Sequence, residues 1–309
     1  MNHLCKIGLL IFTIFLWGGC LGSSSLTPPS WFATTPKDDS LFVGFGNAKT
    51  LDAAKANALS DIITQINVSV QSQFNLNTQR QNSNIEYHSS NDVWLDSSNI
   101  EIGSVQYTKN EFKNNLYYVQ AQIPKTALIK QFQTKFNNLY NMLNASKIGQ
   151  CQALSAKEFA LLSQNIENLQ LYALYLETLN QSTQDLSKFE NLLAQNSPLP
   201  QAKLLINSND TSSVIKEMIK NDMIKEYGHF YAIDANAKNT LKNDVIISTN
   251  GKEVKIEVTL TILDCKNNPS FSTRVTHTHS ASKQYDALRF ASQRVSVQLY
   301  KQIQEWIER

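Results

Sequence analysis

The chain of 309 residues has few cysteines and few charged residues, and neither group is spaced as in a common functional motif. Its four cysteines form no close pairs, which excludes a zinc-finger array and a small disulfide-stabilised scaffold. Charged residues make up 17% of the chain and the formal net charge is +2, so the composition does not predict a nucleic-acid binder. Polarity comes instead from 31 Asn and 23 Gln, whose neutral amides create no long-range field. The length suggests about two domains.

The amino terminus carries a short apolar segment. Ile7–Trp17 contains 11 residues and follows the positively charged Lys6. It is too short for a bilayer, which needs about 20 residues, but it is typical of a signal peptide. Gly18-Gly19-Cys20 follows, and two small residues before a cysteine resemble a bacterial lipoprotein signal cleaved between Gly19 and Cys20. The alternatives are an ordinary secretory signal with an incidental cysteine and an uncleaved anchor.

We therefore predict a lipoprotein signal peptide over residues 1–19 and a flexible tether over residues 20–29, which is rich in Ser, Gly and Pro. Lipid on Cys20 would hold the mature chain permanently on a membrane, because each buried CH₂ contributes about 0.8 kcal/mol.

Residues 30–149 are predicted to form one α+β domain. Leu41–Gly46 has the pattern of a short strand, and Thr50–Ile66 has apolar residues at helical spacing. Ile66–Leu76 then alternates apolar and polar residues, which predicts a strand. The polar segment Asn77–Ser98 is expected to be a loop.

The rest of this domain is predicted as two strands and a helix. Alternation resumes at Ile100–Ser104, a turn is expected at Lys109-Asn110, and Leu116–Ile123 is the next strand. Pro124 suits the first turn of a helix. The apolar stripe of that helix consists of Leu128, Phe132, Phe136, Leu139 and Leu143.

Residues 150–197 are predicted to form a helical hairpin, since Ser155 and Glu158 fit a capping box before an apolar stripe. Leucines at heptad-like spacing would also suit a coiled coil, but about two heptads per helix favour an intramolecular pair. Residues 198–309 are predicted to form a second α+β domain, in which Asn250-Gly251 marks a β-hairpin. The predicted fold class is thus α+β, with two antiparallel-sheet-plus-helix domains flanking a helical hairpin.

The first of these domains resembles a known family. The residues that carry the resemblance are Trp31-Phe32 after Pro28-Pro29, then Val43–Ala48, then the alanine-rich Ala53–Leu59 leading to Asp61-Ile62-Ile63. They are similar to the LPP20 lipoproteins, envelope proteins of Helicobacter and Campylobacter, over about residues 30–145. The resemblance implies an α+β domain and no catalytic residues. It also implies a location at the outer membrane, facing the periplasm or the cell surface, with a released form as an additional expectation. Some members of this family belong to flagellar motor discs or to secreted antigens.

The C-terminal part resembles other proteins only in the order of its elements. It is similar in this respect to the amino-terminal domain of the periplasmic protein TolB and to modules of a flagellar assembly protein. No residue-level motif accompanies that likeness.

A pair of glycines and a pair of histidines are the candidates for a nucleotide site and a metal site. Gly44-Phe45-Gly46 lies between a strand and a helix, but Lys49 occupies the place of the third glycine of a dinucleotide fingerprint. Close packing of the helix explains the glycines equally well, so no nucleotide or other cofactor is predicted. His277 and His279 would point to the same face of a strand, where they are either metal ligands or partly buried side chains. No third ligand is identifiable, so no metal is predicted.

Two cysteines, Cys151 and Cys265, remain once Cys20 carries lipid. In an oxidising compartment leftover cysteines often pair, so a disulfide is favoured over two separate thiols.

The function predicted from these observations is a non-enzymatic, lipid-anchored envelope scaffold or interaction module, linked to flagellar or secreted assemblies. The alternative is a small-ligand carrier, whose pocket would use the aromatic residues between positions 87 and 118. Trp94 and Tyr107 are partner-binding anchors if exposed and core residues otherwise. Envelope proteins and the membrane are the predicted partners; nucleic acid is not.

Overall fold

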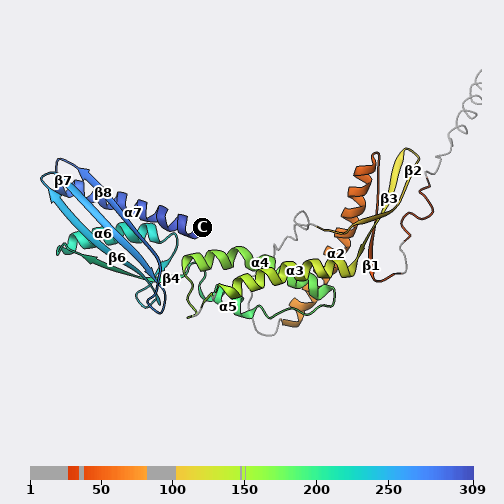
Figure 1. The fold of residues 1–309 in the computed structure, drawn as a ribbon, viewed down its shortest axis with the longest axis horizontal. Coiled ribbons are helices and arrows are strands. Elements are labelled where there is room, and N and C mark those ends of the chain that lie inside the picture. Colours follow the sequence, from red (N-terminus) through yellow and green to blue (C-terminus); the bar gives the residue numbers. More distant parts are fainter. Residues whose placement is uncertain (1–26, 35–37, 82–101, 147, 150) are drawn as a thin grey trace, which may run out of the picture. The chain divides into compact units, whose positions relative to one another are not determined.

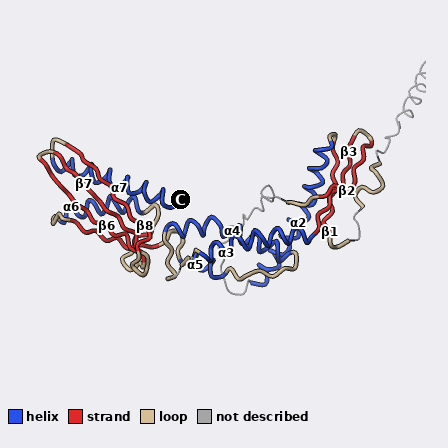
Figure 2. The backbone as a smooth tube through the Cα atoms, viewed as in Figure 1, coloured by secondary structure: helices blue, strands red, loops and turns tan. Residues whose placement is uncertain are grey.

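The chain folds into two compact units (Figure 1), one up to Leu128 and one from Ile129 to Arg309. The structure is a computed structural model. It describes residues 27–34, 38–81, 102–146, 148–149 and 151–309, with backbone alone for residues 73–81. Each unit contains one β-sheet together with helices (Figure 2), so the α+β class predicted from the sequence is confirmed.

The first unit is built on a three-stranded antiparallel sheet in the order β1-β3-β2. Its strands are β1 (Leu41–Ala48), β2 (Gln106–Lys113) and β3 (Leu116–Pro124). The central strand β3 pairs with β1 from Leu41 opposite Pro124 to Ala48 opposite Tyr117.

The hairpin between β2 and β3 turns at Asn114 and Asn115. Their φ angles are 54° and 62°, the left-handed values that a two-residue hairpin turn requires and that Asn tolerates. The turn predicted at Lys109-Asn110 is therefore wrong, because both residues lie within β2, beside a bulge that follows Tyr107. Of the strand expected at Ile100–Ser104, residues 102–104 are not in a strand and residues 100–101 lie outside the described residues; β2 begins at Gln106.

Helix α2 (Leu51–Gln81) packs on the sheet of the first unit. The strand predicted over Ile66–Leu76 is wrong, since that segment continues the helix. Ile66 and Val70 are buried to 3% and 0% exposure, whereas Val68 between them is 61% exposed. In a segment that alternates apolar and polar residues, every second apolar residue is four positions from the next, which is also the spacing of one face of a helix. The loop predicted over Asn77–Ser98 is wrong at its start, because Asn77–Gln81 still belongs to the helix. Residues 82–101 lie outside the described part of the chain.

Three helices follow, namely α3 (Lys125–Ala145), α4 (Ala156–Thr178) and α5 (Ser187–Gln195). Phe132 of α3 stacks on Tyr175 of α4 with ring centroids 4.7 Å apart. Both parts of the predicted capping box are present: Ser155 accepts from the Glu158 backbone, and the Glu158 side chain accepts from the Ser155 backbone.

The second unit contains a five-stranded sheet in the order β5-β4-β6-β7-β8. The strands are β4 (Gln201–Ser208), β5 (Ala232–Ile233), β6 (Asn239–Asn250), β7 (Glu253–Leu263) and β8 (Pro269–Ser280). The sheet is mixed and not wholly antiparallel as predicted, because β4 runs parallel to β5 and β6. A helix connects β4 to them, and such a crossover returns the chain to the end of the sheet where β4 began.

The predicted β6–β7 hairpin is confirmed, but its turn lies one residue later than Asn250-Gly251. Asn250 pairs with Glu253, so Gly251 and Lys252 form the turn, and only Gly251 has a positive φ, 60°.

Helices α6 (Ser213–Tyr227) and α7 (Gln284–Glu308) lie together against this sheet (Figure 1). The strand residues that point toward the core alternate along β7 and are at most 1% exposed: Val254, Ile256, Val258, Leu260 and Ile262. Within the described residues, no helix is both long enough and apolar enough to cross a membrane.

Candidate functional sites

The predicted lipid-attachment residue Cys20 and its neighbour Gly19 lie outside the described residues. The described chain begins at Thr27, seven positions after Cys20. Lipidation and cleavage therefore stay predictions. Residues 27–29, the end of the predicted flexible tether, lie within the described residues and are held by contacts with the first sheet.

Residues 27–34, which we term the N-terminal clasp, pack on the three-stranded sheet. The Phe32 ring contacts Tyr118 and Phe45 edge-on, with centroids 4.9 and 5.7 Å apart. Pro29 is buried, and Tyr118 is only 3% exposed. Tyr118 and Phe45 lie on the sheet face opposite Gly44 and Gly46, which face α2, so the clasp and α2 cover opposite faces.

Polar contacts hold the same segment against the β2–β3 hairpin. Trp31 donates from Nε1 to Glu111 Oε2 at 3.0 Å, and Lys109 Nζ lies 5.7 Å from the centre of the Trp31 ring. Asn114 Nδ2 donates to the Thr27 carbonyl at 3.3 Å, and Lys113 Nζ to the Pro28 carbonyl at 3.5 Å. The first residues of the clasp therefore lie at the tip of the β2–β3 hairpin.

Gly44 and Gly46, which were weighed against a dinucleotide fingerprint, lie where α2 packs closely on β1. A Cβ on Gly44 would overlap the Ala58 carbonyl oxygen, and one on Gly46 would lie 2.8 Å from the Asn57 carbonyl carbon. Asn57 also donates to the Asn47 carbonyl at 2.9 Å, which ties helix to strand. The space that a phosphate would need is thus filled by α2.

The two histidines considered as metal ligands lie side by side on β8. The rings of His277 and His279 are 6.3 Å apart, and His279 also contacts Phe290 of α7 at 5.1 Å. In the part of the chain that the structure describes, no three His, Cys, Asp or Glu residues are grouped to hold a metal. The arrangement fits partly buried histidines that pack beneath α7.

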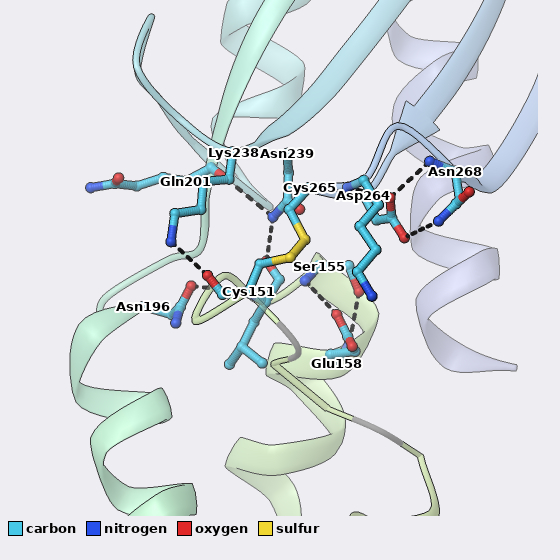
Figure 3. The surroundings of a disulfide bond; sticks show 12 residues. Cys151, Ser155, Glu158, Asn196, Gln201, Lys238, Asn239, Asp264, Cys265 and Asn268 are labelled. Carbon is cyan, nitrogen blue, oxygen red and sulfur yellow. Dashed lines mark hydrogen bonds between the residues drawn. A yellow bond between two sulfur atoms is a disulfide. The ribbon is translucent and has the colours of Figure 1, made fainter.

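Cys151 and Cys265 form the disulfide that the sequence favoured over free thiols (Figure 3), with Cα atoms 6.3 Å apart. Cys151 lies in the connection between α3 and α4, and Cys265 in the loop between β7 and β8. The bond therefore ties the helices of the second unit to its sheet.

Hydrogen bonds from the sheet hold the same connection in place. Lys238 Nζ donates to the Cys151 carbonyl at 2.6 Å, and Asn239 Nδ2 donates to the Leu154 carbonyl at 2.8 Å. The Tyr231 hydroxyl accepts from the Ala156 backbone at 3.0 Å. We term Cys151, Cys265, Lys238, Asn239 and Tyr231 the junction.

The loop that carries Cys265 is organised by Asp264 (Figure 3). Its carboxylate accepts from the backbone of Asn268 and of Lys266, both at 2.8 Å. The Asn268 backbone bond is the largest cause that lowers the pKa of Asp264 from its ordinary value of 3.8. A charged Asp264 thus stabilises the β7–β8 loop in the form that positions Cys265.

Buried tyrosines of the second unit act as fixed hydrogen-bonding groups. Tyr227 donates from its hydroxyl to Asn243 Oδ1 at 2.6 Å, and burial raises its pKa above the ordinary value. Burial also raises the pKa of Tyr231, and that of Tyr175 to about 12. These hydroxyls remain protonated at physiological pH.

The sheet of the second unit has one face that α6 and α7 do not cover, which we term the open face. Its polar rows include an ion-pair chain in which Glu257 contacts Arg274 at 3.5 Å and Lys255 at 4.0 Å. Leu205 and Ile246 also belong to it and are 45% and 51% exposed. This mixture of opposite charges and two exposed aliphatic side chains suits contact with a protein surface. It suits a partner that carries many charges of one sign less well.

One of the two proposed aromatic anchors can be placed. Tyr107 is 40% exposed on the edge strand β2, so it does not belong to the core, and Lys55 Nζ lies 5.4 Å from its ring centre. Trp94 lies outside the described residues, as does Tyr87. The other aromatic positions assigned to a carrier pocket lie on β2 and β3, namely Tyr107, Phe112, Tyr117 and Tyr118.

Sequence reasoning missed the junction side chains and the role of Asn114. The disulfide itself was predicted, but Lys238, Asn239 and Tyr231 were not. The partners of these three residues and of Asn114 are between 75 and 87 residues away in the chain. The sequence signal that was available for Asn114 is the pair Asn114-Asn115 itself, which suits a tight turn.

Comparison with known proteins finds a family match for most of the first unit. Residues 29–124, from the clasp to the end of β3, match the family model of the LPP20 lipoproteins, which confirms the resemblance inferred from Trp31-Phe32 and the alanine-rich helix. The match supports an envelope lipoprotein. No curated protein sequence matches the chain.

Several solved structures are similar to the chain at low identity. A secreted protein of Helicobacter pylori, HP1454, is 15% identical, with 85% of this chain and 98% of that chain covered and a TM-score of 0.47. The N-terminal domain of Thermus thermophilus Protein Y is 16% identical, with 32% and 93% covered and a TM-score of 0.21. The PelC dodecamer of Paraburkholderia phytofirmans is 16% identical, with 31% and 84% covered and a TM-score of 0.24.

Proposed function

We propose that this protein is a non-enzymatic envelope scaffold, anchored in the outer membrane by lipid on Cys20, whose open face binds another envelope protein. The LPP20 match supports the envelope location. The observation that carries the binding role is the open face itself, since Leu205 and Ile246 remain about half exposed beside a fully packed core.

The geometry of the open face suits a protein surface. It spans β6, β7 and the 12-residue edge strand β8, which presents unpaired backbone groups. A specific protein interface buries about 1,600 Å² in total, and a face of several long strands provides an area of that order. Its charged groups lie in local pairs, including Lys242 with Asp244 at 3.2 Å, so they favour orientation over strong non-specific attraction.

Photo-crosslinking in the cell tests the binding role. The reactive amino acid p-benzoylphenylalanine replaces Ile246 or Thr276 on the open face, and Lys301 on the exposed side of α7 serves as the control. We expect a discrete protein adduct from the two sheet positions and none from Lys301. Equal labelling at all three positions, or none at Ile246 and Thr276, would contradict the proposal. A small molecule that stays bound through purification would favour the carrier instead.

Fractionation tests the anchor separately. Cys20→Ala should move the protein from the membrane to the soluble fraction, and the intact mass of the membrane form should include lipid on Cys20. An unmodified mature terminus at another residue would contradict lipidation. Motility and envelope integrity of a deletion strain then show whether the partner belongs to a flagellar assembly.

A further inference from the structure

We infer that the tip of the β2–β3 hairpin lies against the lipid surface, so that the first unit stands on the membrane with Phe112 and Lys113 in contact with it. The inference rests on the proposed lipid anchor at Cys20. It adds an orientation and a second, non-covalent membrane contact to that anchor.

The first argument is the length of chain between the anchor and the clasp. Seven residue steps separate Cys20 from Thr27, and a fully extended chain spans at most about 3.5 Å per residue, or about 25 Å in all. Thr27 and Pro28 are bonded through their carbonyls to Asn114 and Lys113. The hairpin tip can therefore never be more than about 25 Å from the lipidated cysteine.

The second argument is the chemistry of the surface at this end of the sheet. Phe112 is 58% exposed although it lies 4.7 Å from the Tyr117 ring. Lys113 is beside it, and Lys49 is exposed directly after Ala48, the residue that pairs with Tyr117. Aromatic and basic side chains together are the combination that favours a membrane interface and anionic headgroups.

The opposite end of the same sheet has a different character. Asp38 and Asp39 precede Leu41, the residue that pairs with Pro124. Hydrogen bonds from Ser40 hold the pKa of Asp38 below its ordinary value, so this carboxylate stays charged. Lys125, which follows Pro124 at this end, offsets part of that charge. Two carboxylates beside one ammonium still attract an anionic lipid surface less than Lys49 and Lys113 do at the other end. Both arguments thus orient the hairpin tip toward the membrane.

The experiment compares fluorescent labels at the two ends of β1. Full-length lipidated protein carries Lys49→Cys or Asp39→Cys, while Cys151 and Cys265 remain bonded. Each is reconstituted in phosphatidylethanolamine–phosphatidylglycerol vesicles with a headgroup quencher. The labels lie about 25 Å apart along an eight-residue strand, so we expect about threefold stronger quenching at Lys49→Cys. Equal quenching, or stronger quenching at Asp39→Cys, would overturn the inference.

Two further variants separate the causes. Trp31→Ala with Phe32→Ala should release the clasp, lengthen the free chain and remove the difference between the labels, whereas Trp31→Phe should preserve part of it. A clasp-free variant that keeps the full difference would contradict the tether argument. If Cys20→Ala remains membrane-bound, the proposed anchor fails, but the two labels still report which end faces the lipid.

Discussion

The two sheets of this protein bury their second faces to different extents. In the first unit the clasp covers the face opposite α2, and Val43 and Gln120 are only 4% and 1% exposed on that side. In the second unit α6 and α7 cover one face, and the other leaves Leu205 and Ile246 about half exposed. A three-stranded sheet thus uses its own amino-terminal segment as a cover, while the larger sheet is stable with one face in solvent.

This difference suits the two roles proposed for the units, membrane anchoring for the first and partner binding for the second. In the small sheet the clasp and α2 pack on opposite faces of β1 and β3, and only the edge strand β2 stays exposed along nearly its whole length. The larger sheet keeps a broad surface available. We therefore expect substitutions at the clasp or at the junction to destabilise one unit without the other.

The disulfide should give the largest effect, and it should act on the second unit alone. Cys151→Ser with Cys265→Ser opens a loop of 114 residues, which the chain-entropy relation equates with about 5 kcal/mol of unfolding free energy. Calorimetry should show the second unit melting earlier and the first unit unchanged. Identical melting of the second unit with and without reductant would show that the bond contributes nothing.

Gly46→Val should destabilise the first unit by about 3 kcal/mol, because its side chain would overlap the backbone of α2 near Ala54 and Asn57. The matched control is Gly251→Ala in the second unit. No atom lies within 4 Å of the added methyl group there, and only the φ of 60° is unfavourable, at about 1 kcal/mol. Urea unfolding measures both, and an effect of Gly46→Val no larger than that of the control would contradict close helix packing.

Phe32→Ala should cost the first unit about 2 kcal/mol, since the ring packs on Tyr118 and Phe45 and seals that face of the sheet. Phe290→Ala in the second unit is the control. It removes a ring that is 45% exposed, so the expected change stays within about 0.5 kcal/mol. Faster hydrogen exchange of β3 amides in Phe32→Ala should accompany the loss. Unchanged exchange would mean that the clasp is not part of the folded unit.

Tyr227→Phe should cost the second unit about 1 kcal/mol, because Asn243 Oδ1 would lose its buried donor. Tyr285→Phe, at a residue 54% exposed, should change nothing measurable. Urea midpoints of the two variants provide the comparison.

The smallest expected effect is the acid dependence from Asp264. Its pKa is lowered in the folded protein, chiefly by the Asn268 backbone N–H, so its stabilising contribution is complete above the ordinary value of 3.8. The contribution is lost as the pH falls through the lower, folded-state pKa. The melting temperature of the second unit should therefore fall less steeply below about pH 4 in Asp264→Asn than in the parent. Parallel curves would contradict this assignment.

Local sequence patterns predicted several elements well. The alternation from Val254 to Ile262 and the Ser155–Glu158 capping box both describe contacts within a few residues, and both are confirmed. The Ile66–Leu76 segment failed because β-branched residues at every second position also fit i, i+4 burial on a helix. Deciding between the two requires knowing what packs against the segment.

Contacts between distant residues could not be predicted. The pairing of β4 with β6 depends on the crossover through α6, and both strands have patterns equally suited to antiparallel neighbours. Lys238 and Asn239 contribute to the junction only because the fold brings them to the α3–α4 connection. Asn and Lys are common surface residues, and nothing adjacent in the sequence distinguishes these two.

The separation of Cys151 and Cys265 also sets an order of events during export. In a chain that emerges amino terminus first, Cys151 enters the oxidising compartment 114 residues before its partner. At a delivery rate near that of synthesis, about 5–20 residues per second, the interval is of the order of ten seconds. Helices form far faster than this, so α4 and α5 are in place before Cys265 arrives. The bond therefore locks an existing arrangement. Under the proposed lipidation, acylation of Cys20 would also remove the thiol that could otherwise compete for Cys151 during this interval.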